Sequence, residues 1–255
     1  MGTLILSEAS DRVAVLTLNR PERHNSLIPE LLGDSLAVLE AWQNRPDLRA
    51  MVLQANGRSF STGGDVRAFA EHRADIAAYS NRVVGLLNRV ILTLIDFPIP
   101  IVAAVHGIVT GGSIGLVLAS DIVLAAPAAT FTPYYTTVGF SPDGGWTALL
   151  PSLIGAKRAA ETLLIDQPIT ADQAVAWGMV NRIVPADQIH DEARAVAASI
   201  ARQMPGSVKR TKRLLWGDRN LIAARLDDER KKFVEQIESV EAQDGMTAFL
   251  QRRAR

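Results

Sequence analysis

The triplet Thr-Gly-Gly occurs twice, at 62–64 and at 110–112, and each copy follows an apolar run typical of a strand. A helix that begins after such a turn has unpaired backbone N–H groups and partial positive charge at its start. Glycine lets a ligand approach this backbone because it has no Cβ. The amides of Gly64 and Gly112 could therefore form an oxyanion hole, in which one donor contributes on the order of 3 kcal/mol.

Spacing alone leaves another explanation of the triplets open. Both could be tight turns that bring a helix close to a strand, with no role in binding. Neither copy fits the glycine spacing of a dinucleotide fingerprint or a phosphate-binding loop. Ser113 follows the second triplet without a nucleophile-elbow pattern or an adjacent base, so a serine hydrolase is not indicated.

Asp143 is a candidate acid or base within the stretch SPDGGWTALLP. A free aspartate is ionised at pH 7, and an apolar pocket would raise its pKa and suit it to moving protons. The same stretch is a plausible helix start, where aspartate is a favoured N-cap that contributes about 1 kcal/mol. Both roles are open for Asp143. No clustering of His, Asp and Glu suggests a metal site.

The composition excludes several classes of function. The 255 residues include no cysteine, which excludes disulfides, thiolate chemistry and cysteine-bound metals. The 27 basic and 27 acidic residues cancel, and no basic patch predicts a nucleic-acid partner. Segment 97–120 carries no Asp, Glu, Lys or Arg, but its prolines and glycines divide it, so no membrane span is predicted. Without a signal peptide, a cytoplasmic protein is expected.

Strands and helices must hold the glycine turns and the aspartate in place. Apolar runs that end at turn signals predict strands, and apolar residues at helical spacing predict helices. Thr170 is the expected N-cap of one such helix. The predicted strands lie in 12–22, 48–57, 99–105 and 121–126, and the predicted helices in 29–44, 76–95, 112–119, 141–155 and 170–180.

The order of these elements repeats before about residue 190. A strand, a glycine turn, a short extended piece and a helix follow one another several times, which predicts a spiral of β-β-α turns, or at least an α/β fold with parallel strands. From about 190 onward the chain reads as charged amphipathic helices only. These helices could cover their own core or a neighbouring subunit.

Five stretches together resemble the crotonase, or enoyl-CoA hydratase/isomerase, superfamily, nearly from end to end. They are LNRPERHNSL, SFSTGGDV, VAAVHGIVTGGSIGLVLASDIVLAA, VGFSPDGGWTALLPSLIGAKRA and DGMTAFLQRR. The resemblance implies an α/β, crotonase-like spiral core with an acyl-CoA site in residues 1–190, and a C-terminal helical trimerisation region in 191–255. It also implies homotrimers or hexamers (dimers of trimers), and a substrate thioester oxygen held by Gly64 and Gly112. Coenzyme A would be part of the substrate, so no separate cofactor is expected.

The resemblance also bears on the reaction. Hydratases of this family carry two glutamates, and the matching positions here are Gly115 and Tyr135. Adding water to a double bond needs a base for the water and a proton source, so classical hydration is in doubt. Asp143 stands where hydratases have glycine and some isomerases have aspartate. The expected activity is therefore that of an enoyl-CoA isomerase, shifting a double bond or rearranging a ring, with Asp143 as acid and base.

Alternatives to the isomerase follow from the same family. Asp143 could be a nucleophile, as in dehalogenase-like or hydrolase-like members. A hydratase-like lyase is a further alternative, and so is a catalytically silent acyl-CoA binding protein. The sequence does not define the acyl group.

The resemblance assigns further residues to the substrate. Arg23 matches a basic position near the coenzyme A phosphates, where the planar guanidinium suits phosphate oxygens. Phe249 and Arg252 match an aromatic and a basic position near the nucleotide, often supplied by a neighbouring subunit. Tyr135 could line the acyl pocket or donate a hydrogen bond. Asp65, beside Gly64 at the substrate site, is expected to bond local backbone and hold its loop. Either arginine could instead be a solvated surface charge.

Overall fold

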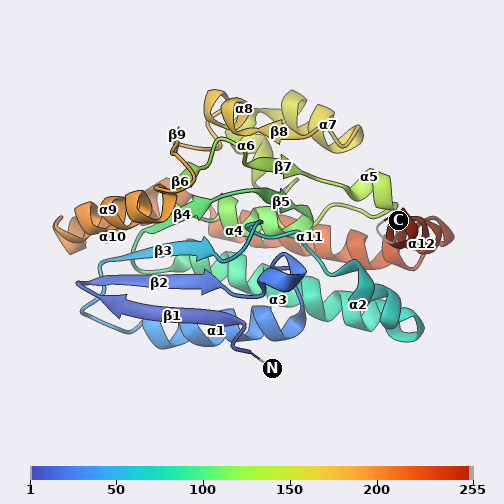
Figure 1. The fold of residues 1–255 in the computed structure, drawn as a ribbon, viewed down its shortest axis with the longest axis horizontal. Coiled ribbons are helices and arrows are strands. Elements are labelled where there is room, and N and C mark those ends of the chain that lie inside the picture. The colour runs from blue at the N-terminus through green and yellow to red at the C-terminus, as the bar shows by residue number, and fades with distance from the viewer. Residues whose placement is uncertain (1, 253–255) are drawn as a thin grey trace.

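The computed structural model describes residues 2–252, and for Arg252 the backbone only. Its larger sheet has six strands in the order β1-β2-β3-β4-β6-β9 (Figure 1). β1 pairs with β2 in an antiparallel manner, and every other neighbouring pair in this sheet is parallel. The strands are β1 (Ile5–Ser10), β2 (Val13–Leu18), β3 (Ala50–Ala55), β4 (Ile101–Val105), β6 (Ile122–Ala125) and β9 (Arg182–Ile183).

A second, three-stranded sheet comprises β5 (Ile108–Thr110), β7 (Thr130–Thr132) and β8 (Ile169–Thr170). β5 and β7 are parallel, and β8 is antiparallel to β7. Two single-residue bridges extend this sheet, one between Ser61 and Val109 and one between Leu27 and Gly64. These bridges extend the second sheet along the first Thr-Gly-Gly turn, and β5 ends at Thr110, the first residue of the second turn.

The β-β-α repeat predicted from the sequence is present. β4 is followed by β5, and β6 is followed by β7, so that each strand of the larger sheet leads into a short strand of the smaller one. β3 leads in the same way to Ser61, which bridges to β5. Helices then carry the chain back to the next strand. The predicted helix 76–95 is α3 (Ile76–Asp96), and Thr170 caps α8 (Ala171–Ala176) with a full capping box.

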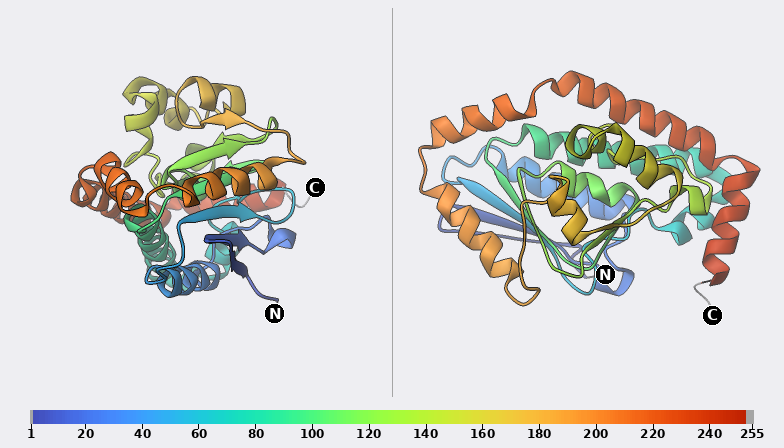
Figure 2. Two further views of the ribbon diagram at one scale, coloured as in Figure 1. Left: turned by 90° about the vertical axis from the view of Figure 1, so that its left-hand side faces the viewer. Right: turned by 90° about the horizontal axis from the view of Figure 1, so that it is seen from above.

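Helices cover both faces of the larger sheet (Figures 1 and 2). Residues that alternate along β2, β3 and β4 pack on one side with α1 (Pro29–Trp42) and α3, and on the other with α9 (Ile189–Ala201). Strands buried on both faces must be apolar at every position, which is why these segments read as uninterrupted apolar runs. Segment 97–120 is divided among β4, β5, η3 (Gly111–Ser113) and α4 (Ile114–Leu118). Within residues 2–252, the helices are all too short or too polar to cross a membrane.

The C-terminal region is helical and wraps around the same chain. α10 (Pro205–Trp216) and α11 (Arg219–Ile237) run along one side of the molecule, and α12 (Val240–Arg252) turns back at its end (Figure 2). α11 packs on α3, and α12 reaches α2 (Val66–Glu71) and α5 (Tyr135–Val138), so the helices cover the core of their own chain. The remaining helices are η1 (Pro21–Arg23), η2 (Arg73–Asp75), α6 (Leu150–Ile154) and α7 (Ala156–Leu164).

Candidate active site

The two Thr-Gly-Gly turns lie against each other. A Cβ placed on Gly63 would stand 2.5 Å from the carbonyl oxygen of Thr110, so only glycine allows this approach. The hydroxyl of Ser113 joins the turns by donating to the carbonyl oxygens of Ser61 (3.0 Å) and Thr110 (2.7 Å). Tight packing, the simpler explanation of the triplets, therefore accounts for Gly63. It applies to the second glycines as well, because a Cβ on Gly64 would stand 2.7 Å from Cε2 of Phe69 and one on Gly112 would stand 2.7 Å from Cδ2 of Leu87.

Gly64 and Gly112, the second glycines, line one small cavity of about 60 Å³. Leu27 hydrogen-bonds the Gly63 carbonyl and the Asp65 amide, which leaves the amide of Gly64 on the opposite side of the extended chain. Gly112 lies in the first turn of η3, where helix amides lack intrahelical partners. The structure thus brings both glycines to one site, and the joint binding of one oxyanion stays a prediction.

Asp143 reaches the same cavity and is 6% exposed. A Cβ on Gly112 would lie 2.9 Å from each of its carboxylate oxygens. Gly144 has a φ of +68°, and a Cβ there would be 2.3 Å from the Gly112 carbonyl oxygen. The glycine after the aspartate is therefore required for the 143–145 loop to rest on the second Thr-Gly-Gly turn. This contact places the carboxylate beside the backbone of Gly112.

The helix-capping interpretation of Asp143 is wrong. Residues 144–149 form turns, and α6 begins only at Leu150, with Leu149 at its N-cap position. The amide of Gly145, which a capping aspartate would bind, donates instead to Glu229. The predicted helix 141–155 is correspondingly shorter, because two successive glycines with positive φ interrupt it.

Asp143 is held by Tyr135. The Tyr135 hydroxyl donates to Oδ1 of Asp143 at 2.5 Å and also lies 3.1 Å from its carbonyl oxygen. Burial raises the pKa of Asp143, the Tyr135 hydrogen bond lowers it and the nearby charge of Glu229 raises it, and together these effects bring the pKa to about 7. Burial and the neighbouring carboxylate also raise the pKa of Tyr135 well above its ordinary value. Tyr135 lines the cavity, as predicted, and its hydroxyl is directed at Asp143.

Glu229 was not identified from the sequence. It lies on α11, is 5% exposed, and its carboxylate binds the loop that follows Asp143. A signal for it existed, because Leu226, Glu229, Phe233 and Ile237 form the buried stripe of α11. A charged residue within an apolar helical stripe requires a polar partner. Nothing in the sequence indicates that this partner is the Asp143 loop.

The positions that match the two hydratase glutamates differ in the space around them. A Cβ on Gly115 would stand 2.3 Å from Cδ1 of Ile91 and 2.5 Å from the carbonyl oxygen of Gly144. A glutamate cannot occupy this position without displacing the loop that carries Asp143. The second position, Tyr135, supplies a hydroxyl. The cavity therefore has its carboxylate at Asp143.

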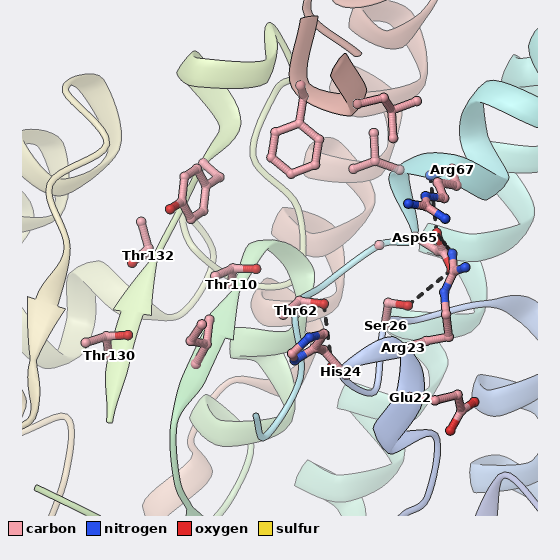
Figure 3. A pocket seen from close by; sticks show the side chains of 16 residues that line it. Glu22, Arg23, His24, Ser26, Thr62, Asp65, Arg67, Thr110, Thr130 and Thr132 are labelled. Atoms are coloured by element: carbon pink, nitrogen blue, oxygen red, sulfur yellow. Dashed lines mark hydrogen bonds and ion pairs between the residues drawn. The ribbon is translucent and has the colours of Figure 1, made fainter. Parts of the chain in front are cut away.

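A larger, more polar cavity of about 350 Å³ adjoins the first, and both are lined by Thr62, Gly64, Val66 and Tyr134. Figure 3 shows its two walls, with Arg23, Asp65 and Arg67 on one side and three threonines on the other. The threonines are Thr110, Thr130 and Thr132. Gly64 thus stands where a polar outer cavity meets the inner cavity that contains Asp143.

Asp65 organises one wall of the outer cavity. Its carboxylate accepts hydrogen bonds from Arg20 (3.0 Å), Arg23 (2.9 Å), Ser26 (3.2 Å) and the amide of Arg67 (3.2 Å). Burial would raise the pKa of Asp65, but the Arg20 hydrogen bond and the charges of both arginines bring it below the usual value. Asp65 caps α2 and holds the loop that contains Gly64, as expected. With these donors in place, Asp65 holds the arginines of the cavity wall and the Gly64 loop in position.

The other predicted substrate residues have different positions. Arg23 lines the outer cavity while paired with Asp65, and its side chain is 35% exposed. Phe249 also lines this cavity, from α12 of the same chain. The side chain of Arg252 lies outside the described residues. Arg67, an exposed cation two residues after Asp65, lines the cavity and was missed.

Comparison with known proteins decides the family. The model of the enoyl-CoA hydratase/isomerase family matches residues 8–255. This chain belongs to the enoyl-CoA hydratase/isomerase family. The crotonase resemblance read from the five sequence stretches is thereby confirmed.

Individual relatives carry both names of the family. The chain is 30% identical to the 1,2-epoxyphenylacetyl-CoA isomerase of Escherichia coli K12, over 100% of its own length and 98% of the relative. A crystal structure of an enoyl-CoA hydratase/isomerase from Pseudoalteromonas atlantica is 30% identical, with a TM-score of 0.87 and 98% of each chain covered. An enoyl-CoA hydratase from Mycobacterium avium subsp. paratuberculosis is 28% identical, with a TM-score of 0.86 over 98% of this chain and 96% of that one.

The fold and the substrate class follow from membership of the enoyl-CoA hydratase/isomerase family. The crotonase-type α/β architecture with a C-terminal helical region is confirmed. An acyl-CoA thioester fits the family as substrate. Relatives at about 30% identity include both an isomerase and a hydratase. These comparisons therefore establish the family of this chain.

Proposed function

We propose that this protein is an enoyl-CoA isomerase in which Asp143 takes a proton from the acyl chain and returns it to another carbon. Removal of the proton next to, or conjugated with, the thioester carbonyl places negative charge on the thioester oxygen. Two amides, those of Gly64 and Gly112, would stabilise that charge. Return of the proton at a second carbon completes a shift of a double bond, or the rearrangement of a ring, without water being added.

The position of Asp143 carries this proposal. It is a buried carboxylate beside Gly112 in the inner cavity, and the two positions that match the hydratase glutamates hold Gly115 and Tyr135. Its pKa of about 7 suits a group that must accept and donate a proton at neutral pH. Hydration would require a second acid or base, and the two matching positions do not supply one. A single residue that moves one proton is sufficient for isomerisation.

An aromatic or cyclic acyl group would suit the inner cavity. Phe69, Phe140 and Phe233 line it, and their ring centroids are 5.5 to 6.2 Å apart, at tilted or edge-on angles. An aromatic acyl group could pack against these rings in the same edge-on or offset manner. The name of the Escherichia coli relative, an epoxyphenylacetyl-CoA isomerase, points in the same direction. We include phenylacyl and cyclic acyl thioesters among the substrates to be tested.

The outer cavity would hold coenzyme A. Arg23 and Arg67 supply cations for its phosphates, and Phe249 supplies an aromatic surface. The assembly proposed is a homotrimer or a dimer of trimers. Its support is a set of highly exposed large apolar side chains, which a second copy could cover. They include Leu164 (72% exposed), Met204 (79%), Leu214 (83%) and Leu215 (79%).

Proton exchange with heavy water tests the isomerase proposal. The wild-type protein, incubated with enoyl-, phenylacyl- and dienoyl-CoA thioesters in deuterium oxide, should incorporate deuterium and shift the double bond in at least one of them. Asp143→Asn should bind the same thioester and show neither change, because the amide cannot accept the proton. Mass spectrometry reports both the exchange and any covalent adduct.

Other outcomes would contradict the isomerase proposal, and most of them would support one of the alternative functions. Unimpaired exchange in Asp143→Asn would remove the aspartate from the mechanism. A covalent acyl- or aryl-enzyme adduct at Asp143 would indicate the dehalogenase-like or hydrolase-like reaction. Mass gain of one water in the product would indicate a hydratase-like lyase. Thioester binding without exchange in the wild-type protein would indicate a silent acyl-CoA binding protein.

A further inference from the structure

The carboxylate of Glu229 accepts hydrogen bonds from several residues that follow Asp143. Its Oε2 accepts from the amide of Gly145 at 2.7 Å. Its Oε1 accepts from the amide of Thr147 at 2.7 Å, from the Thr147 hydroxyl at 2.6 Å and from the amide of Ala148 at 2.9 Å. One carboxylate on α11 thus binds three amides of a loop that begins 84 residues earlier in the chain.

These contacts replace the hydrogen bonds that a regular helix would give the loop. Residues 144–149 are turns, so their amides need acceptors from elsewhere when they are buried. Trp146 adds a further tie, because its indole N–H donates to the carbonyl oxygen of Gly111 at 2.9 Å. The loop is therefore fixed to α11 on one side and to the second Thr-Gly-Gly turn on the other. Asp143 lies at the start of this fixed segment.

The charge of Glu229 also reaches Asp143. Within the described chain, the ionisable groups that act on Asp143 are Tyr135 of α5, whose hydrogen bond lowers the pKa, and Glu229 of α11, whose charge raises it. Burial raises the pKa of Glu229 itself above its usual value, and its hydrogen bonds to Thr147, Gly145 and Ala148 offset part of this rise. Fixed N–H donors favour the ionised carboxylate, which only accepts hydrogen bonds.

We propose that Glu229 is a positioning residue for catalysis, which holds the carboxylate of Asp143 against Gly112 and sets the pH range over which Asp143 takes up its proton. The inference rests on the proposed role of Asp143 as acid and base. It assigns a task in the reaction to α11, a helix of the C-terminal region that contributes no group in contact with the thioester carbonyl in this scheme.

Glu229→Gln tests the inference, because it keeps the size of the side chain and removes the charge. An amide has one oxygen and directs an NH₂ group at backbone donors, so the loop must loosen. We expect kcat to fall by roughly 10- to 100-fold, in line with small displacements of catalytic groups, with little change in KM. The acid limb of the kcat/KM profile should move to lower pH, because the charge that raises the pKa of Asp143 is gone.

Glu229→Asp separates the effect of loop position from the effect of charge on Asp143. It retains the charge but shortens the side chain by one methylene, so it should lower kcat while the acid limb stays near its wild-type position. Thr147→Val removes one of the four hydrogen bonds without changing any charge, and should cause a smaller loss of kcat with no shift. Glu235→Gln, an exposed carboxylate on the same helix that pairs with Lys232, is the matched control and should leave kcat and the pH profile unchanged.

A direct readout of Asp143 keeps the test independent of turnover. The C=O stretch of a protonated buried aspartate, identified in infrared difference spectra by its loss in Asp143→Asn, can be titrated in each variant. The midpoint should fall in Glu229→Gln and stay in Glu229→Asp. An unchanged midpoint and unchanged kcat in a folded Glu229→Gln protein would overturn the inference. If Asp143→Asn itself retained full turnover, the isomerase proposal would fail first, and the infrared midpoint would still report whether Glu229 acts on Asp143.

Discussion

The hydroxyl of Tyr135 and the Oδ1 atom of Asp143 are 2.5 Å apart, and both side chains are almost completely buried. Tyr135 lies in the short helix α5, whereas Asp143 begins a loop that packs on the second Thr-Gly-Gly turn. A hydrogen bond to the ionised carboxylate stabilises that form, so Tyr135 opposes the effect of burial on the pKa of Asp143. Tyr135, at the position that matches the second hydratase glutamate, thus lowers the pKa of the proposed acid–base group Asp143.

Tyr135→Phe should move the acid limb of kcat/KM to higher pH. Loss of the hydroxyl removes the hydrogen bond that favours ionised Asp143, so its pKa rises above about 7. Activity at pH 6 should fall by about tenfold for each pH unit of displacement, and it should recover in alkaline buffer. A pH–rate profile of the variant beside the wild-type protein measures the shift. Displacement toward lower pH would contradict the assigned direction, which is opposite to that expected for Glu229→Gln.

Asp143→Asn should change how stability depends on pH. The folded carboxyl group has a pKa of about 7 and the unfolded one about 3.8, so between these values the folded chain binds the extra proton. The free energy of unfolding therefore falls as the pH rises from about 4 to about 7, and this group contributes no further change above that. The loss amounts to about 4 kcal/mol at about 1.4 kcal/mol per pH unit.

Urea unfolding at pH 5 and pH 8 measures this difference. The wild-type protein should lose more stability between the two values than Asp143→Asn, because asparagine does not titrate. Subtracting the two proteins removes the contribution of the other titrating groups. Parallel pH profiles for both proteins would mean that Asp143 ionises in the folded state as easily as in water.

Gly112→Ala should abolish most of the activity while the protein still folds. The added methyl group would meet Cδ2 of Leu87 at 2.7 Å and both Asp143 oxygens at 2.9 Å. It would displace the carboxylate and disturb one of the two proposed oxyanion donors, whose removal costs about 100- to 1,000-fold in kcat. Steady-state kinetics with the best thioester provides the measurement. Gly33→Ala is the matched control, because a Cβ there meets nothing within 4 Å.

Gly115→Glu should not turn the protein into a hydratase. Its Cβ would lie 2.3 Å from Cδ1 of Ile91 and 2.5 Å from the Gly144 carbonyl oxygen, in a buried position. Overpacking and a buried carboxylate together should lower the free energy of unfolding by about 3 kcal/mol or more. Thermal unfolding and a water-addition assay test both parts. A stable variant with hydratase activity would show that the loop after Asp143 can move to make room for the glutamate, which would contradict this prediction.

Local patterns in the sequence predict much of the fold and the position of the site. Apolar runs and glycine turns predict the repeated strands and the helix 76–95, and Thr170 predicts a helix start. Each of these features depends on neighbours within a few residues, so short-range chemistry is sufficient. The candidate residues Gly64, Gly112 and Asp143 likewise stand in recognisable stretches, and the fold brings them to one cavity.

The interactions of Asp143 could not be predicted in the same way. Its stretch resembles a helix start, and local preference favours capping. The structure instead directs the amide of Gly145 to Glu229, on a helix far along the chain, and binds Oδ1 of Asp143 to Tyr135. The place of Glu229 in the apolar stripe of α11 indicates burial, but it does not indicate that the Asp143 loop is the partner.

By itself, the sequence determined the succession of β-β-α turns, the two glycine turns, the presence of Asp143 and the absence of glutamate at positions 115 and 135. Residue type and spacing determine these properties, because backbone freedom and apolar periodicity act locally. Only the tertiary structure decided that this carboxylate is buried between a tyrosine and a second carboxylate, since burial and charge depend on which distant segments pack together. That packing gives Asp143 its pKa of about 7.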